Sequence, residues 1–227
     1  MLPWIHLDTA SVQGGGELRL MQRGAEFSIM AGAIELMNSR LSGSEEALAN
    51  LTCERVRDCP AASVLIGGLG MGFTLRAALK SLGDDARVVV AELVPAVIAW
   101  ARGPLAPVFG ECLEDPRVTI READVGALIR GHKTAYDAIL LDVDNGPDGL
   151  TREANDSLYN LAGLSAARAA LRPAGILAVW SSGPDAAFTR RLRTAGFEVD
   201  EVKVRANGTR GGARHLIWLA TRPGGSS

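Results

Sequence analysis

The segment Val64–Lys80, VLIGGLGMGFTLRAALK, decides the fold of this chain. Its first three residues form an apolar run that predicts a buried strand, and its last residues predict a helix. The glycines between them let the backbone turn sharply and approach a ligand closely, and the start of the helix offers unpaired N–H groups. We therefore expect Gly68, Gly70 and Gly72 to line a bound nucleoside, although such glycines also serve as plain strand-to-helix turns.

Strand–helix units then repeat along the chain. The expected strands are residues 64–66, 87–91, 117–121, 138–141, 176–180, 197–205 and 215–220. This alternation predicts an α/β fold, namely a three-layer Rossmann-like sandwich with a mostly parallel seven-stranded sheet. Because no helix separates the last two strands, we expect the last strand to be antiparallel.

The first sixty residues do not continue the strand–helix alternation. Glu17–Arg23 and Glu26–Met30 alternate polar and apolar residues on either side of Gly24, which predicts a small β-hairpin. A helix is expected to follow, with Ser44 as its N-cap. We divide the chain into residues 1–60, a hairpin and helix extension; residues 61–222, the nucleoside-binding Rossmann-like catalytic domain; and residues 223–227, a flexible tail.

Composition excludes several classes of function. The net charge of -2 creates no global field that would attract nucleic acid or an acidic membrane. The N-terminus shows no signal peptide and no apolar stretch is long enough to cross a bilayer, so we expect a cytoplasmic protein that does not bind membranes. Neither the three cysteines nor the three histidines have metal-ligand spacing, and no metal is expected.

Two acidic residues follow strands that should end at the glycine loop. Glu92 closes the second strand, 20 residues beyond Gly72, where a carboxylate can accept hydrogen bonds from both ribose hydroxyls. The alternative is an exposed turn carboxylate. Asp124, with Val125 beside it, follows the third strand and could accept from an exocyclic amine such as that of adenine. Asp124 could equally cap the next helix, and both roles can coexist.

The fourth strand ends in Asp142-Val143-Asp144-Asn145, at the edge where ligands bind in open α/β sheets. Clustered carboxylates raise one another's pKa, which suits a general base. We therefore expect Asp142 and Asp144 to be catalytic, with Asp142 as the stronger candidate. A solvated turn, in which aspartates are common, is the alternative.

These patterns resemble those of one family. Residues 64–76, 88–102, 118–127 and 136–182 are similar to the nucleoside-binding motifs of class I methyltransferases, and more finely to spermidine synthases, the aminopropyltransferase branch of that fold. The resemblance implies that the three loop glycines line the donor, Glu92 holds the ribose, Asp124 holds the adenine and Asp142 deprotonates the attacking amine. The residues expected at the acceptor are Glu45, Asn145, Tyr159 and Trp180.

The sequence also departs from that family. The family's glycine loop carries an acidic residue that contacts the donor's amine, whereas Leu69-Gly70-Met71 has no carboxylate. A tyrosine of the polyamine site is replaced by Leu48, and a second aspartate by Asn145. We therefore expect methyl transfer to a small or peptide-like acceptor. Aminopropyl transfer to a polyamine and a catalytically inactive nucleoside-binding scaffold are the alternatives.

The expected donor is S-adenosylmethionine or its decarboxylated form, and an enzyme of the transferase class is expected. The expected partner is a small-molecule or peptide acceptor. The resemblance implies a homodimer.

Overall fold

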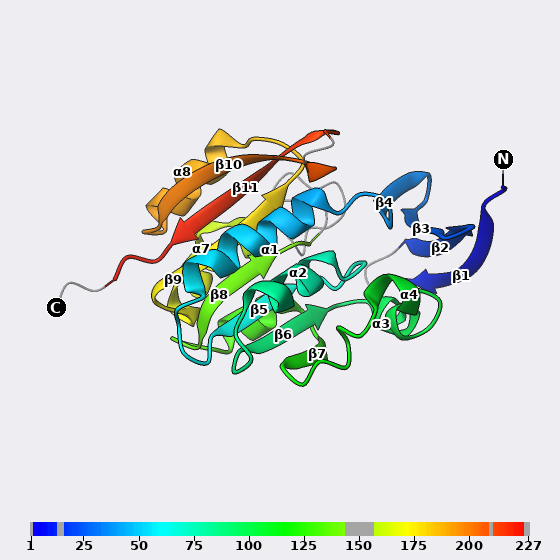
Figure 1. Ribbon diagram of the computed structural model, residues 1–227. Coiled ribbons are helices and arrows are strands. Elements are labelled where there is room, and N and C mark those ends of the chain that lie inside the picture. The colour runs from blue at the N-terminus through cyan, green and yellow to red at the C-terminus, as the bar shows by residue number, and fades with distance from the viewer. Residues whose placement is uncertain (1, 13–15, 144–156, 209–210, 225–227) are drawn as a thin grey trace.

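The computed structural model describes residues 2–12, 16–143, 157–208 and 211–224, which form two β-sheets with helices (Figure 1). The larger sheet has seven strands in the order β10-β11-β9-β8-β5-β6-β7. Its strands are β5 (Ser63–Gly67), β6 (Arg87–Glu92), β7 (Val118–Glu122), β8 (Tyr136–Leu141), β9 (Leu171–Ser181), β10 (Glu198–Arg205) and β11 (Arg214–Thr221). Strand β11 is antiparallel to both of its neighbours, while β9, β8, β5, β6 and β7 pair in parallel. The expected sheet is thus confirmed.

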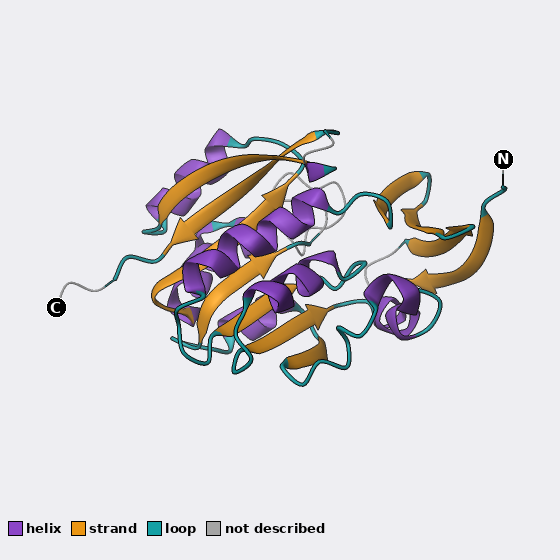
Figure 2. Ribbon diagram, in the orientation of Figure 1, coloured by secondary structure: helices purple, strands orange, loops and turns teal. Residues whose placement is uncertain are grey.

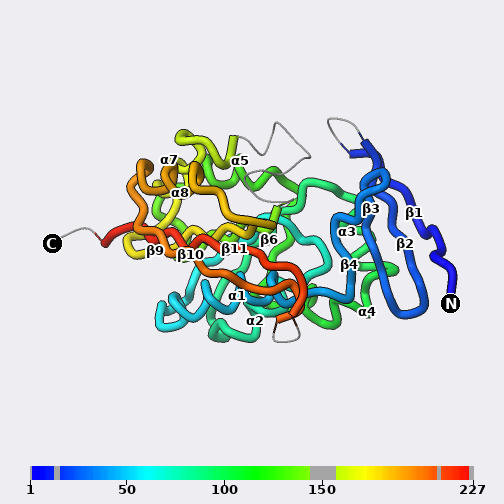
Figure 3. Tube along the Cα trace, turned by 90° about the horizontal axis from the view of Figure 1, so that it is seen from above, coloured from blue at the N-terminus to red at the C-terminus, as the bar shows by residue number. Residues whose placement is uncertain are grey.

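Helices cover both faces of this sheet, as a three-layer sandwich requires (Figures 2 and 3). The described helices are α1 (Gly43–Val56), α2 (Phe73–Ser81), α3 (Pro95–Arg102), α4 (Ala106–Phe109), α5 (Val125–Arg130), α7 (Leu161–Ala170) and α8 (Ala186–Thr194). Helices α1 and α2 lie on one face, and α5, α7 and α8 on the other. Side chains of β5 alternate accordingly, because Val64 and Ile66 join the core under α1 and α2 while Leu65 joins the opposite core.

The smaller sheet contains the expected hairpin and two further strands that the sequence patterns missed. It is fully antiparallel, in the order β1 (Ile5–Ser11), β2 (Glu17–Arg23), β3 (Glu26–Ala31) and β4 (Ile34–Asn38). Strand β1 gave no usable periodicity because it is exposed on both faces. The indole of Trp100 on α3 donates a hydrogen bond to the Asp8 carboxylate on β1, with a nitrogen–oxygen distance of 2.7 Å. This bond joins the small sheet to the sandwich.

The start of α1 differs from the expectation. The helix begins at Gly43, and Ser42 occupies the N-cap position without a side-chain capping bond. The Ser44 hydroxyl, expected to cap the helix, instead donates to the Glu45 carboxylate at 2.7 Å. Helix α1 packs on α2 and on β8 and β9 of the large sheet. The proposed division at residue 60 stays a prediction.

Within the described residues, every helix is either too short or too polar to cross a bilayer.

Candidate active site

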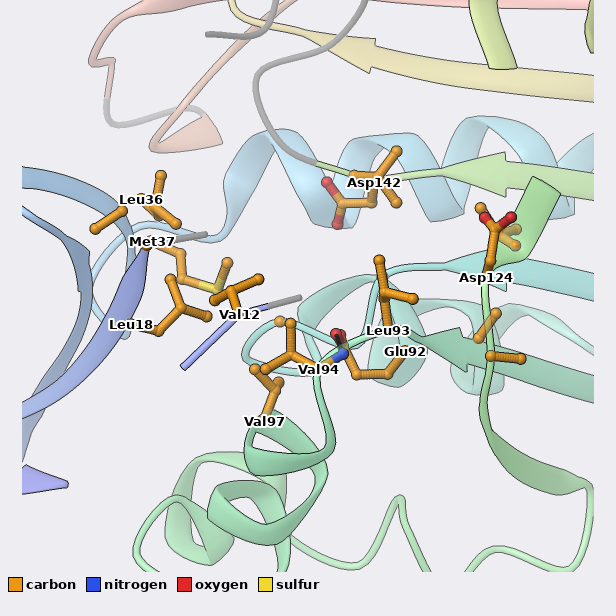
Figure 4. Close-up of a pocket in the computed structure, with 18 of the residues that line it drawn as sticks. Val12, Leu18, Leu36, Met37, Glu92, Leu93, Val94, Val97, Asp124 and Asp142 are labelled. Carbon is orange, nitrogen blue, oxygen red and sulfur yellow. Dashed lines mark hydrogen bonds between the residues drawn. The ribbon is translucent and has the colours of Figure 1, made fainter. Parts of the chain in front are cut away.

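A cavity of about 340 Å³ opens where the parallel strands end (Figure 4). This volume falls within the range of small-molecule sites. Loops after four strands contribute to its wall, and so does the small sheet. The lining residues used below are Gly68 and Gly70 after β5, Glu92 at the end of β6 and Val94 after it, Asp124 and Val125 after β7, Asp142 after β8, and Val12, Leu18, Leu36 and Met37 of the N-terminal region. The carboxyl edge therefore gathers the predicted nucleoside residues in one place, except Gly72, which lines a smaller neighbouring cavity.

The glycine loop is shaped by backbone conformations that side chains rarely adopt. Gly68 has a φ of +92° and Gly72 a φ of +76°. A β-carbon at Gly68 would collide with the backbone carbonyl oxygen of Asp142, and one at Gly72 would lie 2.5 Å from the Phe109 ring. Glycine is therefore required at both positions, first so that the loop can touch the end of β8 and second so that α2 can start against α4.

Glu92 ties two loops together beneath the cavity. One carboxylate oxygen accepts from the backbone N–H of Leu69 at 3.0 Å, and the other accepts from Val94 at 2.8 Å. Burial raises the pKa of this carboxyl, while these backbone donors oppose the rise. The backbone N–H groups of Leu93 and Gly70 also approach this carboxylate, and Glu92 lines the cavity, where its oxygens can accept from hydroxyl donors of a ligand as well. The residues present thus fit a ribose.

Asp124 was expected to cap the next helix and to contact a nucleoside base, and the structure shows the helix cap. Its carboxylate caps α5, accepting from the backbone N–H groups of Gly126 at 2.9 Å and Ala127 at 3.1 Å. It also pairs with Arg130 at 3.2 Å. Asp124 and Val125 both line the cavity, so capping leaves them beside any ligand there.

Asp142 lies at the junction of the large cavity with a smaller one of about 70 Å³. Its backbone N–H donates to the carbonyl of Gly67, and its side chain accepts from the Thr74 hydroxyl at 2.6 Å. Burial raises the pKa of the carboxyl, whereas the Thr74 hydrogen bond lowers it. A carboxylate with a raised pKa at the mouth of a cavity can accept a proton from a bound substrate.

The smaller cavity brings together residues that are distant in the sequence. Glu45, Asp142 and Trp180 line it, along with Gly72 of the glycine loop. Burial and the nearby charge of Asp142 raise the pKa of Glu45 to about 7. The Trp180 indole N–H is buried without a hydrogen-bond partner among the described residues. Near neutral pH the carboxyl pair of Glu45 and Asp142 can therefore readily gain or lose a proton.

Apolar residues of the small sheet form the other side of the large cavity. Figure 4 shows Leu18, Leu36 and Met37 facing Glu92 and Asp142 across the space. Sequence reasoning missed this wall because nothing local in a strand indicates which ligand site the sheet will cover. Thr74 was missed for a similar reason, since its partner Asp142 lies 68 residues away.

Tyr159, predicted at the acceptor, does not line the site. Tyr159 is buried in the core, edge-on to Phe188 at a centroid distance of 5.6 Å, and lines neither cavity of the described part of the chain. Its role at the acceptor stays a prediction without support from this geometry. Asp144 and Asn145 lie outside the described residues.

Comparisons with known proteins agree on one group of enzymes. Polyamine aminopropyltransferase 1 of Streptomyces coelicolor is 31% identical over 153 residues, which are 64% of this chain and 28% of that protein. The polyamine aminopropyltransferase of Mycobacterium tuberculosis is 33% identical over 148 residues, 61% of this chain and 27% of the relative. The chain thus spans about a quarter of the length of these relatives. No protein-family model matches the chain.

Solved structures show the same fold. The spermidine synthase of Thermotoga maritima superposes with a TM-score of 0.76 at 20% identity, over 96% of this chain and 72% of that one. The chain therefore has a spermidine synthase-like fold, as the sequence resemblance implied.

The expectation of methyl transfer is wrong, because the matching relatives are named polyamine aminopropyltransferases. That expectation gave most weight to missing side chains, such as the acidic residue absent from Leu69-Gly70-Met71. Folding nevertheless places two carboxyls, those of Glu45 and Asp142, on one small cavity. Glu45 and Asp142 lie 97 positions apart, so local motifs could not show that they share a cavity.

Proposed function

We propose that this chain transfers an aminopropyl group from decarboxylated S-adenosylmethionine to a primary amine. The observation that carries the proposal is the junction at Asp142, where a cavity of nucleoside size meets a small cavity lined by carboxyls. The names of the relatives and the likeness to spermidine synthase structures support the same reaction.

In this proposal the large cavity holds the nucleoside of the donor. Glu92, which lines this cavity, accepts hydrogen bonds from the ribose hydroxyls while its carboxylate also holds the backbone N–H groups of Leu69 and Val94. Asp124 and Val125 contact the adenine while Asp124 continues to cap α5. Gly68 and Gly70 allow the backbone close approach, and the apolar wall with Met37 shields the donor from water.

The small cavity holds the acceptor. An alkylamine carries a proton at neutral pH, as a lysine side chain does, and has no free electron pair until that proton leaves. Asp142 accepts the proton, and the neutral nitrogen attacks the propyl carbon bound to the sulfonium. The carbon–sulfur electron pair returns to sulfur, so a neutral thioether and a secondary ammonium result. Glu45, whose pKa is raised to about 7, carries a negative charge part of the time at neutral pH, and this charge attracts the incoming ammonium.

Mass spectrometry of the products tests the proposal. The purified chain is incubated with decarboxylated S-adenosylmethionine and putrescine, then separately with other primary amines. We expect methylthioadenosine and the aminopropylated amine in equal amounts. Asp142→Asn should still bind the donor but lower kcat by about 10² to 10⁴, the usual contribution of a general base.

Calorimetric titration with the donors provides the matched control. Glu92→Ala should weaken donor binding, whereas Glu54→Ala, an exposed carboxylate on α1, should leave it unchanged. Tight donor binding without transfer to any amine would refute the enzyme and favour a nucleoside-binding scaffold. The homodimer and the cytoplasmic location stay predictions.

A further inference from the structure

A chain of hydrogen bonds leads away from the small cavity through α1 to β11. The Ser44 hydroxyl donates to the Glu45 carboxylate at 2.7 Å, and Nδ1 of His215 lies 2.9 Å from the same hydroxyl. Ser44 is buried, with 1% of its surface exposed, whereas His215 is half-buried and so reaches solvent. The connection runs from a carboxyl on the cavity to an imidazole at the surface.

The fold holds this chain in place from several sides. The backbone N–H of Gly43 donates to the carbonyl of Ala206 at 2.9 Å, which fastens the start of α1 to the hairpin of β10 and β11. The His215 ring stands edge-on to Trp180 at a centroid distance of 4.8 Å. Because Ser44 takes no part in capping the helix, its hydroxyl is available to both Glu45 and His215.

We propose that Ser44 and His215 form a proton relay that carries the acceptor's proton from the Glu45–Asp142 carboxyl pair to solvent. The inference rests on the proposed function, which needs such an exit. A primary ammonium that becomes a secondary ammonium by alkylation at nitrogen releases one proton in each turnover. Asp142 receives that proton inside a small cavity that it shares with Glu45.

The relay balances proton by proton. When Glu45 is ionised, His215 donates from Nδ1 to Ser44, and Ser44 donates to Glu45. When Glu45 is protonated, it donates to Ser44, which donates to the bare Nδ1, and the ring carries its hydrogen on Nε2. One transfer along the chain protonates Nδ1, and the loss of the Nε2 proton to solvent restores the first arrangement. No redox partner or additional group is required.

The charges around the relay determine where the proton rests. Asp142, directly after β8, repels the charge of Glu45 more than Glu46 on the same helix does, so Glu45 keeps its proton up to near neutral pH. Burial lowers the pKa of His215, so the imidazolium forms only transiently and returns its proton to solvent readily. The cationic residues on the same hairpin as His215 are Lys203, Arg205 and Arg214.

Nuclear magnetic resonance of the free protein tests the relay without any need for activity. Long-range ¹H–¹⁵N spectra identify which nitrogen of His215 carries the hydrogen. We expect a change from the Nε2–H to the Nδ1–H tautomer as the pH rises through the pKa of Glu45, about 7. Glu45→Gln and Ser44→Ala should abolish the change, and Ser44→Thr, which retains the hydroxyl, should restore it.

A second histidine provides the control. Nδ1 of His132 lies 2.7 Å from the carbonyl of Leu128, so its tautomer should stay constant over the same range. A constant tautomer at His215, or a change that persists in Ser44→Ala, would overturn the relay. Circular dichroism of each variant ensures that only folded protein is compared.

Kinetics adds the catalytic consequence. Ser44→Ala and His215→Ala should lower kcat for aminopropyl transfer about tenfold to a hundredfold, while KM for the amine changes less than about twofold. Added imidazole should rescue His215→Ala but not Ser44→Ala, since only the former lacks the terminal group. His132→Ala should match the wild type. If Ser44→Ala and His215→Ala lowered kcat and raised KM by the same factor, and imidazole rescued neither, the two residues would have a merely structural role and the relay would be overturned.

The two failures are distinguishable. A wild-type chain that transfers no aminopropyl group refutes the proposed function, and the spectra of His215 then decide alone whether the hydrogen-bond switch exists.

Discussion

Replacing Glu45 with glutamine should stabilise this protein at alkaline pH. Burial and the charge of Asp142 raise the pKa of Glu45 from 4.5 to about 7, so the folded state holds a proton that the unfolded state releases. The contribution of Glu45 to the free energy of unfolding is fully present below about pH 4.5 and is lost as the pH rises through about 7. Each pKa unit corresponds to about 1.4 kcal/mol, so the full loss is about 3 kcal/mol.

Glutamine removes the buried charge and retains an oxygen that can accept from Ser44. Relative to the wild type, Glu45→Gln should therefore gain about 1 to 3 kcal/mol in the free energy of unfolding at about pH 8.5. At about pH 5 the wild-type carboxyl is largely protonated and the two proteins should differ by less than about 1 kcal/mol. Urea unfolding at both pH values, followed by circular dichroism, measures the difference.

The control is Glu54→Gln, which removes an exposed carboxylate from the same helix. Its effect on stability should be small at both pH values. If Glu45→Gln were equally stabilising at both pH values, or destabilising at the higher one, the reasoning from burial and repulsion would be refuted.

Three further substitutions test other parts of the structure. Gly72→Ala should destabilise the fold by about 2 to 5 kcal/mol in urea unfolding, because its φ is +76° and the new β-carbon would lie 2.5 Å from Phe109; a loss under about 1 kcal/mol would contradict the geometry. Thr74→Val removes the 2.6 Å hydrogen bond that lowers the pKa of Asp142, so the acidic limb of the kcat/KM profile should move to higher pH, and an unmoved limb would argue against Asp142 as the base. Trp218→Phe should cost about 2 to 4 kcal/mol of unfolding free energy, because the indole is fully buried and donates to Thr189 at 2.9 Å; an unchanged urea midpoint would contradict that account.

Much of the fold could be predicted from the sequence because its information is local. Apolar runs such as Val64–Ile66, followed by glycines, mark where strands stop, and helices between strands impose parallel pairing. Parallel strands end at one edge, so Glu92, Asp124 and Asp142 had to lie near one another once each was placed after its strand. The order of the residues along the chain was sufficient for this part of the site.

Other features depended on packing between distant segments. Strand β1 lacks periodicity because both of its faces are exposed, so only its pairing with β2 reveals it. The apolar wall with Met37 exists because the small sheet lies over the carboxyl edge. The absence of single family residues from local motifs favoured methyl transfer, which is wrong. The charge of the small cavity depends on all the groups that line it, including Glu45 and Asp142.

The sequence by itself determined the parallel sheet, the glycine loop and the row of acidic residues at its edge, because backbone propensity and side-chain periodicity act over a few residues. Only the tertiary structure decided that Glu45 meets Asp142, that Thr74 holds Asp142, and that Ser44 meets His215 from 171 residues away. Such contacts arise when helices and antiparallel strands are brought together to bury apolar surface, and no local pattern encodes which polar groups will meet.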